Sequence, residues 1–217
     1  MMNSTKGGFR ELALRCSRGE RPGRSVGTPG KFLSPAELDR LIKVSALAPM
    51  RERVAIHLAL GTGLRVGEIS RLCCGDITGT DEWSVLKVTQ GKGGKARMVW
   101  FNGDLKKQLA QYLDWKRQQG EGTAPGDPLI KSLVSGGAAA KRTLQRAWSR
   151  LAQRAGITGH SFHHLRHTYA SHLYRASNYN LRLVQKQLGH ANIKTTQIYA
   201  DVFDEDLKNA LEKLYQY

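Results

Sequence analysis

The chain has 217 residues and a net charge of +16, with 34 Lys and Arg against 18 Asp and Glu. That length predicts one compact domain with its own core, and the charge favours a polyanionic partner, DNA or RNA first and an anionic membrane second. No apolar run approaches the ~20 residues of a membrane-spanning helix, and the N-terminus lacks the apolar segment of a signal peptide. We therefore expect a soluble cytoplasmic protein that uses no membrane, and we interpret its three cysteines, an odd number, as reduced thiols.

Residues 1–31 predict a flexible basic arm. They contain six glycines and seven Lys or Arg against two Glu, and they lack a sustained apolar period, so the segment cannot bury enough surface to order itself. An expression leader is the alternative interpretation. The folded part is expected over residues 32–217, beginning with a helix that Ser34 and Glu37 cap and that has Pro35 at its first position.

The next elements follow in chain order. An apolar helix is predicted over residues 54–60, ending at the glycines 61 and 63, and a third, short helix is predicted from Val66 to Leu72. The period then changes: residues 83–88 and 96–100 predict two strands of a hairpin whose tip, residues 91–95, reads GKGGK. Lys92 and Lys95 lie on this tip.

Helical periodicity resumes from Leu105 to Leu113 and again from Leu144 to Leu151. The loop between these helices contains a short strand candidate at residues 129–130, and the last third of the chain predicts a series of short helices. Residues 204–216 predict an amphipathic acidic helix, which a DNA backbone would repel. Its apolar face is expected to pack on its own body or on a neighbouring copy. The predicted class is mainly α with a small antiparallel β-sheet.

Two arginines are candidates for binding a phosphate, because the planar guanidinium can meet two phosphate oxygens at once. Arg65 lies where one helix ends in glycines and another begins, so its side chain and a helix N-terminus could face one anion. Glu68, one turn further on, could hold Arg65, although a surface ion pair is the plainer alternative. Arg166 shares a helix face with His163, whose imidazole can accept or donate a proton near neutral pH.

A zinc site is the alternative interpretation of the same helix, since His163 and His167 have i,i+4 spacing. An arginine between them disfavours a cation, and the glutamate of a zinc-peptidase helix is absent. We therefore predict no metal. Tyr199 is the candidate nucleophile; its phenol, with an ordinary pKa near ~10, needs neighbouring cations or a base to attack at neutral pH. A core tyrosine is the alternative.

Five segments in this order resemble the catalytic domain of the tyrosine recombinase (phage integrase) family. They are residues 63–68 (GLRVGE), 91–97 (GKGGKAR), 163–168 (HHLRHT), 188–190 (LGH) and 195–199 (TTQIY). The resemblance covers roughly residues 33–215 and is greatest to the Xer and integrase branch of bacteria. It implies the fold of that catalytic domain, mainly helical with a small antiparallel sheet.

The resemblance also implies a role for each residue that matches a motif. Arg65 and Arg166 would bind the scissile phosphate, His190 would donate a hydrogen bond to it, and Glu68 would steady Arg65. The reaction would leave the DNA attached to the protein through a 3′-phosphotyrosine.

Tyr199 would be the attacking group of that reaction, Lys92 would protonate the 5′-hydroxyl leaving group, and His163 would assist proton transfer. No metal and no other cofactor would be required. The basic residues expected to contact DNA are Lys95, Arg97, Lys141 and Arg142.

The implied partner is a double-stranded recombination site with inverted repeats, bound by a homotetramer that is a monomer when free, in the cytoplasm at the nucleoid. Residues 204–216 resemble the segment that family members exchange between protomers. A separate N-terminal core-binding domain is not expected, so the chain is either a small single-domain recombinase or a catalytic fragment. The alternatives are a type IB topoisomerase and a DNA-binding relative that has lost catalysis.

Overall fold

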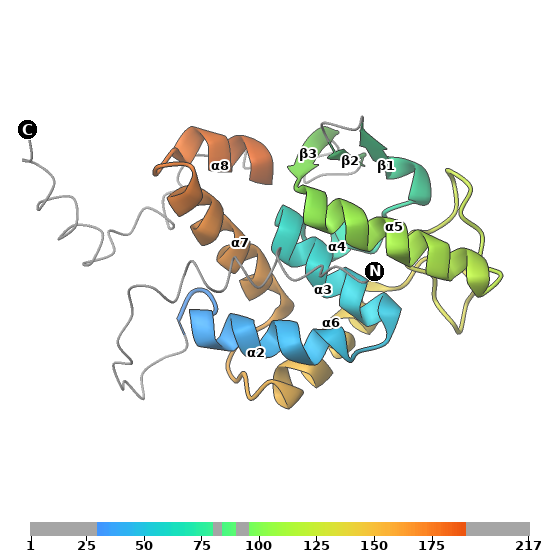
Figure 1. Cartoon of the computed structure of the whole chain (residues 1–217), viewed down its shortest axis with the longest axis horizontal. Helices are drawn as coiled ribbons and strands as arrows, with labels where there is room; N and C mark the ends of the chain where they lie inside the picture. The colour runs from blue at the N-terminus through green and yellow to red at the C-terminus, as the bar shows by residue number, and fades with distance from the viewer. Residues whose placement is uncertain (1–29, 80–83, 90–95, 190–217) are drawn as a thin grey trace, which may run out of the picture.

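The computed structural model describes residues 30–79, 84–89 and 96–189, and helix α3 (Met50–Thr62) lies at the centre of this part (Figure 1). Every side chain from Val54 to Leu60 is buried. A helix that is apolar on all sides can only be satisfied inside a core. It contacts α2 (Pro35–Ala46), α5 (Gly103–Gln118), α6 (Lys141–Arg154) and α7 (Phe162–Ala176).

Helix α2 begins as its sequence predicts. The Ser34 hydroxyl accepts a hydrogen bond from the Glu37 N–H at 3.3 Å, and the Glu37 carboxylate accepts one from the Ser34 N–H at 2.9 Å, with Pro35 as the first helical residue. The preceding residue, Leu33, is buried, and its N–H donates to the Thr168 hydroxyl on α7 at 3.0 Å. The start of the described domain is therefore fixed to the helix that carries Arg166.

The two predicted strands pair antiparallel, as expected. Strand β2 (Ser84–Val88) faces β3 (Arg97–Phe101), with Leu86 opposite Val99, and both of these side chains are buried in the core. A third strand, β1 (Ile77–Gly79), adds to the other side of β2 and gives the order β1-β2-β3. It was not predicted, because three residues are too few to show a period.

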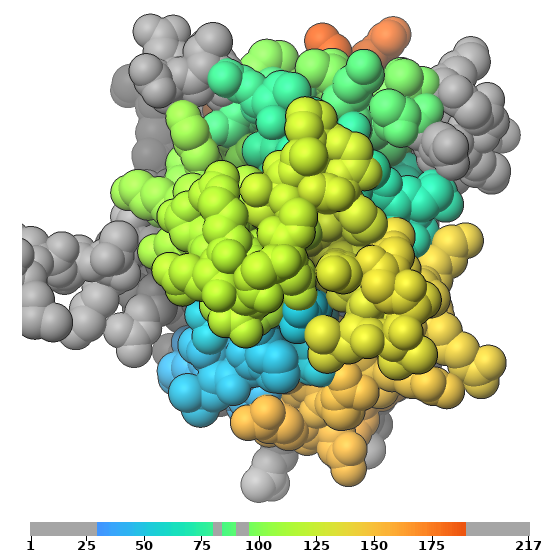
Figure 2. All heavy atoms as spheres, turned by 90° about the vertical axis from the view of Figure 1, so that its right-hand side faces the viewer, coloured from blue at the N-terminus to red at the C-terminus, as the bar shows by residue number. Residues whose placement is uncertain are grey.

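The strand predicted at residues 129–130 is wrong. Leu129 and Ile130 are buried, but they lie in the loop between α5 and α6, which Figure 2 shows beside α5 on one face of the molecule. The carbonyl oxygen of Leu129 accepts a hydrogen bond from the buried Lys116 ammonium at 3.2 Å, and the Leu129 N–H donates to Leu72 at 2.8 Å. The backbone hydrogen-bonding groups of Leu129 are thus satisfied by a lysine side chain and by an irregular segment. The apolar pattern of residues 129–130 does not distinguish this arrangement from a strand in a sheet.

The remaining helices are the short α4 (Val66–Ile69), which ends before the predicted Leu72, the 3-10 turn η1 (Cys74–Asp76) and α8 (Leu181–Leu188). The described part is mainly helical with one antiparallel sheet, which confirms the predicted class. Cys73 and Cys74 are free thiols. In the part of the chain that the structure describes, no helix is both long and apolar enough to cross a membrane. The basic arm, up to residue 29, and the predicted helix 204–216 lie outside this part.

Candidate active site

Arg65 is held at the turn between α3 and α4. Its backbone is extended, it caps the N-terminus of α4, and its N–H donates to the Glu68 carboxylate at 2.8 Å. The guanidinium donates to the other oxygen of Glu68 at 3.2 Å. The contact expected between these two residues is therefore present, and it directs the Arg65 side chain, which is 29% exposed, toward a pocket.

Gly63 allows this turn to approach two other helices. Its φ of +67° ends α3 in the left-handed conformation, which costs glycine least. A Cβ atom at this position would lie 2.4 Å from Tyr169 Cδ1 and 2.6 Å from Leu188 Cδ2. The absence of a side chain is thus what lets α7 and α8 pack directly on the residues that precede Arg65.

Arg166 connects the same turn to the end of α8. It is only 2% exposed, and its guanidinium donates to the carbonyl oxygen of Gly63 at 2.6 Å and to that of Leu188 at 2.9 Å. A buried guanidinium needs such acceptors because its charge cannot be left without polar partners. The side chain fixes the segment before Arg65 relative to Gly189, where α8 ends.

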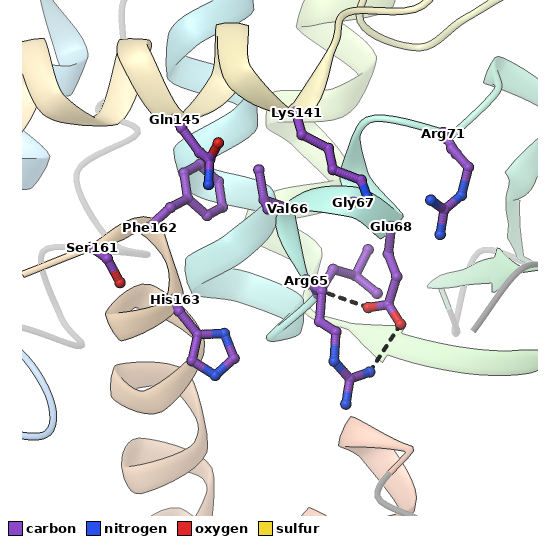
Figure 3. A pocket seen from close by; sticks show the side chains of 11 residues that line it. Arg65, Val66, Gly67, Glu68, Arg71, Lys141, Gln145, Ser161, Phe162 and His163 are labelled. Atoms are coloured by element: carbon purple, nitrogen blue, oxygen red, sulfur yellow. Dashed lines mark hydrogen bonds and ion pairs between the residues drawn. The ribbon is translucent and has the colours of Figure 1, made fainter. Parts of the chain in front are cut away.

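A pocket of about 410 Å³ opens beside Arg65 (Figure 3). Arg65, Arg71 and Lys141 contribute positive charge to its lining, and His163 at the start of α7 contributes an imidazole. Lys141 reaches it across Gly67, where a Cβ atom would lie 2.7 Å from Lys141 Cε. Three cations around one carboxylate make this pocket suitable for an anion.

The imidazole of His163 is set to be neutral at physiological pH. Partial burial, followed by the positive charges of Arg166 and Arg65, lowers its pKa below the ordinary value. The ring of His167 lies edge-on to it, with centroids 4.6 Å apart, and burial lowers the pKa of His167 to about 4. A neutral imidazole can accept a proton, so the helix presents a base next to fixed cations.

The histidines of α7 were the basis of the alternative interpretation as a zinc site. Within the described ranges, no group of three or more His, Cys, Asp or Glu side chains is placed to hold a metal ion. Burial and the positive charge of Arg166 lower the pKa of both His163 and His167, and Arg65 adds to this effect at His163.

The structure brings together some of the residues expected in the site. Arg65, Glu68, His163 and Lys141 line one pocket, whereas Arg142 is exposed on the first turn of α6 and does not line it. The residues expected in the site that lie outside the described part are Lys92, Lys95, His190 and Tyr199.

Arg97 has an unexpected position: its guanidinium is paired with Glu68, and its predicted DNA contact stays a prediction. Three polar residues that line the pocket, Arg71, Gln145 and Ser161, were not predicted. No sequence signal marks them, because they come from three segments that only the fold brings together.

A basic pocket on a helical domain, with arginine, lysine and an imidazole of lowered pKa at one place, suits chemistry on an anionic group such as a phosphodiester, by charge stabilisation and proton transfer. The chain belongs to the phage integrase family, whose sequence profile matches residues 31–206.

Known relatives agree with this assignment. The chain is 32% identical to tyrosine recombinase XerC of Vibrio parahaemolyticus over 224 residues, which cover 99% of this chain and 70% of the relative. It is 40% identical to tyrosine recombinase XerD of Ralstonia nicotianae over 185 residues, covering 82% and 58%. It is therefore a tyrosine site-specific recombinase catalytic domain, of a class that breaks and rejoins DNA.

Solved structures share the fold. XerA recombinase matches with a TM-score of 0.71 and 29% identity, over 90% of this chain and 67% of that one. XerH recombinase, in a post-cleavage complex with a palindromic difH substrate, matches with a TM-score of 0.71 and 25% identity, over 86% and 53%.

Proposed function

We propose that this chain cuts and rejoins a specific double-stranded DNA site through Tyr199. The phenolic oxygen attacks the scissile phosphorus, the bond from phosphorus to the 5′ oxygen breaks, and a 3′-phosphotyrosine and a free 5′-hydroxyl result. The observation that carries this proposal is the pocket in which the cation of Arg65 lies beside the imidazole of His163. That arrangement suits a phosphate that gains negative charge in the transition state.

In the proposed site, Arg65 and Arg166 bind the non-bridging phosphate oxygens and His190 donates a further hydrogen bond. The guanidinium has five N–H donors in a planar fork, so Arg166 can donate to the carbonyl oxygens of Gly63 and Leu188 and still have N–H groups for a phosphate. Glu68 steadies Arg65, as its two hydrogen bonds to that residue support.

Two proton transfers complete the proposed reaction. Lys92, on the hairpin between β2 and β3, gives a proton to the departing 5′ oxygen, and neutral His163 assists removal of the proton from the Tyr199 phenol. The covalent intermediate conserves the phosphodiester energy, so the proposal needs no metal and no other cofactor. Rejoining reverses these steps with a 5′-hydroxyl from a second strand.

The proposed substrate is a DNA site with inverted repeats, bound by four copies of a chain that is a monomer when free. The palindromic substrate of the related XerH supports the symmetry of the site. Lys95, Lys141 and Arg142 are proposed to contact the phosphate backbone, which would place the protein on the nucleoid in the cytoplasm. Residues 204–216 are proposed to pass to a neighbouring copy, and residues 1–31 to form a basic arm ahead of one catalytic domain.

A covalent-trapping experiment tests the proposed chemistry. Genomic fragments selected by binding would supply the site. A nick placed close to the cleavage position traps the intermediate, because the short strand that carries the released 5′-hydroxyl diffuses away and cannot reverse the reaction. We expect a protein–DNA adduct on a denaturing gel that Tyr199→Phe abolishes and that the control Tyr179→Phe, at an exposed position before α8, preserves. Absence of an adduct on every selected site, or an adduct that survives Tyr199→Phe, would refute the proposal.

The same assay separates the two alternatives. Relaxation of supercoiled DNA of arbitrary sequence by a monomer would indicate a type IB topoisomerase. Tight binding at a footprinted site without any cleavage would indicate a relative that has lost catalysis.

A further inference from the structure

Arg97, the first residue of β3, makes a two-point ion pair with Glu68. Arg97 Nη1 lies 2.8 Å from Glu68 Oε1, and Arg97 Nη2 lies 3.0 Å from Glu68 Oε2. The Arg97 side chain is 14% exposed and that of Glu68 only 3%. Two parallel hydrogen bonds between planar groups fix both orientation and distance, so this pair fastens β3 to α4.

The same carboxylate also holds Arg65. Glu68 Oε1 accepts from the Arg65 guanidinium and Oε2 accepts from the Arg65 backbone N–H. Burial by itself would raise the pKa of Glu68, but the hydrogen bonds from Arg97 and Arg65 and the charges of both arginines bring it below the ordinary value. Glu68 is therefore an anion shared by two cations, and the three groups together leave one positive charge beside the pocket.

Arg97 also contacts the end of α8. A Cβ atom on Gly189 would lie 2.5 Å from Arg97 Cδ and 2.7 Å from Arg97 Nε. Gly189 has a φ of +64° and ends the helix. The Arg97 side chain thus passes directly over the backbone of Gly189 and meets Glu68 beyond it, so that one side chain links β3, α4 and the end of α8.

We propose that Arg97 is a positioning residue of the recombinase site, acting on the phosphate-binding Arg65 through Glu68. By engaging both oxygens of Glu68, Arg97 offsets its negative charge and keeps Arg65 from being drawn into a two-point pair of its own. The positive charge of Arg65 then stays directed into the pocket. This inference rests on the proposed role of Arg65 in binding the scissile phosphate.

The chemistry of the pair makes the role specific to arginine. A lysine at position 97 would keep a positive charge and an aliphatic chain over Gly189, but its single ammonium cannot meet both oxygens of Glu68 in their plane. One carboxylate oxygen of Glu68 would then lack a hydrogen bond from residue 97, and the guanidinium of Arg65 would turn toward that oxygen.

The test measures single-turnover formation of the phosphotyrosine adduct by the full chain on a nicked cognate site, and DNA affinity by fluorescence anisotropy. Misplacing a reacting group by about 1 Å costs on the order of 100-fold in rate. We expect Arg97→Ala and Arg97→Lys to slow adduct formation on that order while DNA affinity changes less than threefold. The control Arg117→Ala, which removes an exposed ion pair with Asp114 on α5, should leave both unchanged.

A second substitution makes the test specific to Glu68. With the carboxylate replaced by a neutral amide, Arg65 has no anion to turn toward, so Arg97→Ala combined with Glu68→Gln should react at least tenfold faster than Arg97→Ala alone. Because Glu68→Gln also removes the buried charge that Arg97→Ala leaves unpaired, the rescue counts only where circular dichroism shows that both variants are folded. If Arg97→Ala does not fold, as judged by circular dichroism, Arg97→Lys and its combination with Glu68→Gln decide the question.

Three results would overturn the inference: a normal rate for Arg97→Lys, no rescue by Glu68→Gln, or a loss of DNA affinity as large as the loss of rate. The last would make Arg97 a direct DNA contact. Failure of the proposed function itself looks different, because the unaltered chain would then give no adduct or one that persists in Tyr199→Phe.

Discussion

The guanidinium of Arg166 donates a 2.6 Å hydrogen bond to the carbonyl oxygen of Gly63, a residue 103 positions earlier in the chain. Its second bond, to Leu188 at 2.9 Å, ends at the last residue of α8. A single buried side chain on α7 therefore sets the distance between the turn that presents Arg65 and the end of α8.

Replacing Arg166 with lysine should separate these two segments. One ammonium cannot reach both carbonyl groups with the geometry of a guanidinium, and each lost hydrogen bond from a charged donor is worth about 1.5–3 kcal/mol. We expect Arg166→Lys to lower the free energy of unfolding by about 3 kcal/mol in urea titrations. Arg142→Lys, at an exposed position on α6, should stay within about 0.5 kcal/mol of the unaltered chain. Equal stabilities would contradict this structural role.

Gly63 should tolerate no side chain. Alanine there would combine a left-handed backbone, which costs about 1–2 kcal/mol, with close contacts to Tyr169 and Leu188 that add about 1–3 kcal/mol. We expect Gly63→Ala to lower the free energy of unfolding by about 2–5 kcal/mol. Gly103→Ala is the matched control, because its Cβ atom would meet nothing within 4 Å and alanine favours the helix; it should be neutral or slightly stabilising. A small effect at Gly63 would argue against the packing of α7 and α8 on this turn.

The pH dependence of adduct formation should reflect the lowered pKa of His163. Burial, then Arg166, Arg65 and His164, disfavour its protonated form, so in the free enzyme the pKa of this imidazole lies below the ordinary histidine value of ~6.5. At DNA concentrations well below saturation, the rate reports the free enzyme. Its decline toward acid pH should be centred below about pH 6.5, and His163→Gln should remove this acid limb. A decline centred above pH 6.5 would rule the expectation out.

Stability should depend on pH through a histidine outside the site. Burial, aided by the charge of Arg53 and opposed by a hydrogen bond with Gln108, lowers the pKa of His57 to about 4. Between pH 4 and 6.5 the unfolded chain therefore binds more protons at this residue than the folded chain, so its contribution to stability is lost as the pH falls. Between pH 7 and pH 5 this loss amounts to roughly 2 kcal/mol. Urea titrations of His57→Gln should show a correspondingly weaker pH dependence; an unchanged dependence would disprove the assignment.

Much of the fold could be predicted from local patterns. The Ser34 and Glu37 cap, the apolar helix around Leu58 and the hairpin that pairs Leu86 with Val99 all depend on residues close together in sequence. The errors arose where a pattern was too short or ambiguous. Strand β1 has three residues, and the buried pair at residues 129–130 is equally apolar in a strand or in a loop whose carbonyl groups Lys116 satisfies.

The sequence by itself determined the family and the candidate residues, because five motifs in a fixed order are a property of the chain. It also determined the contact between Arg65 and Glu68, three residues apart on one turn. Only the tertiary structure decided that Arg97 shares Glu68 and that Arg166 joins Gly63 to Leu188. Those contacts depend on how closely α7, α8 and β3 approach the turn after α3. The distance of that approach is set by side chains from distant segments that pack against Gly63 and Gly189. No local pattern of residues encodes such packing.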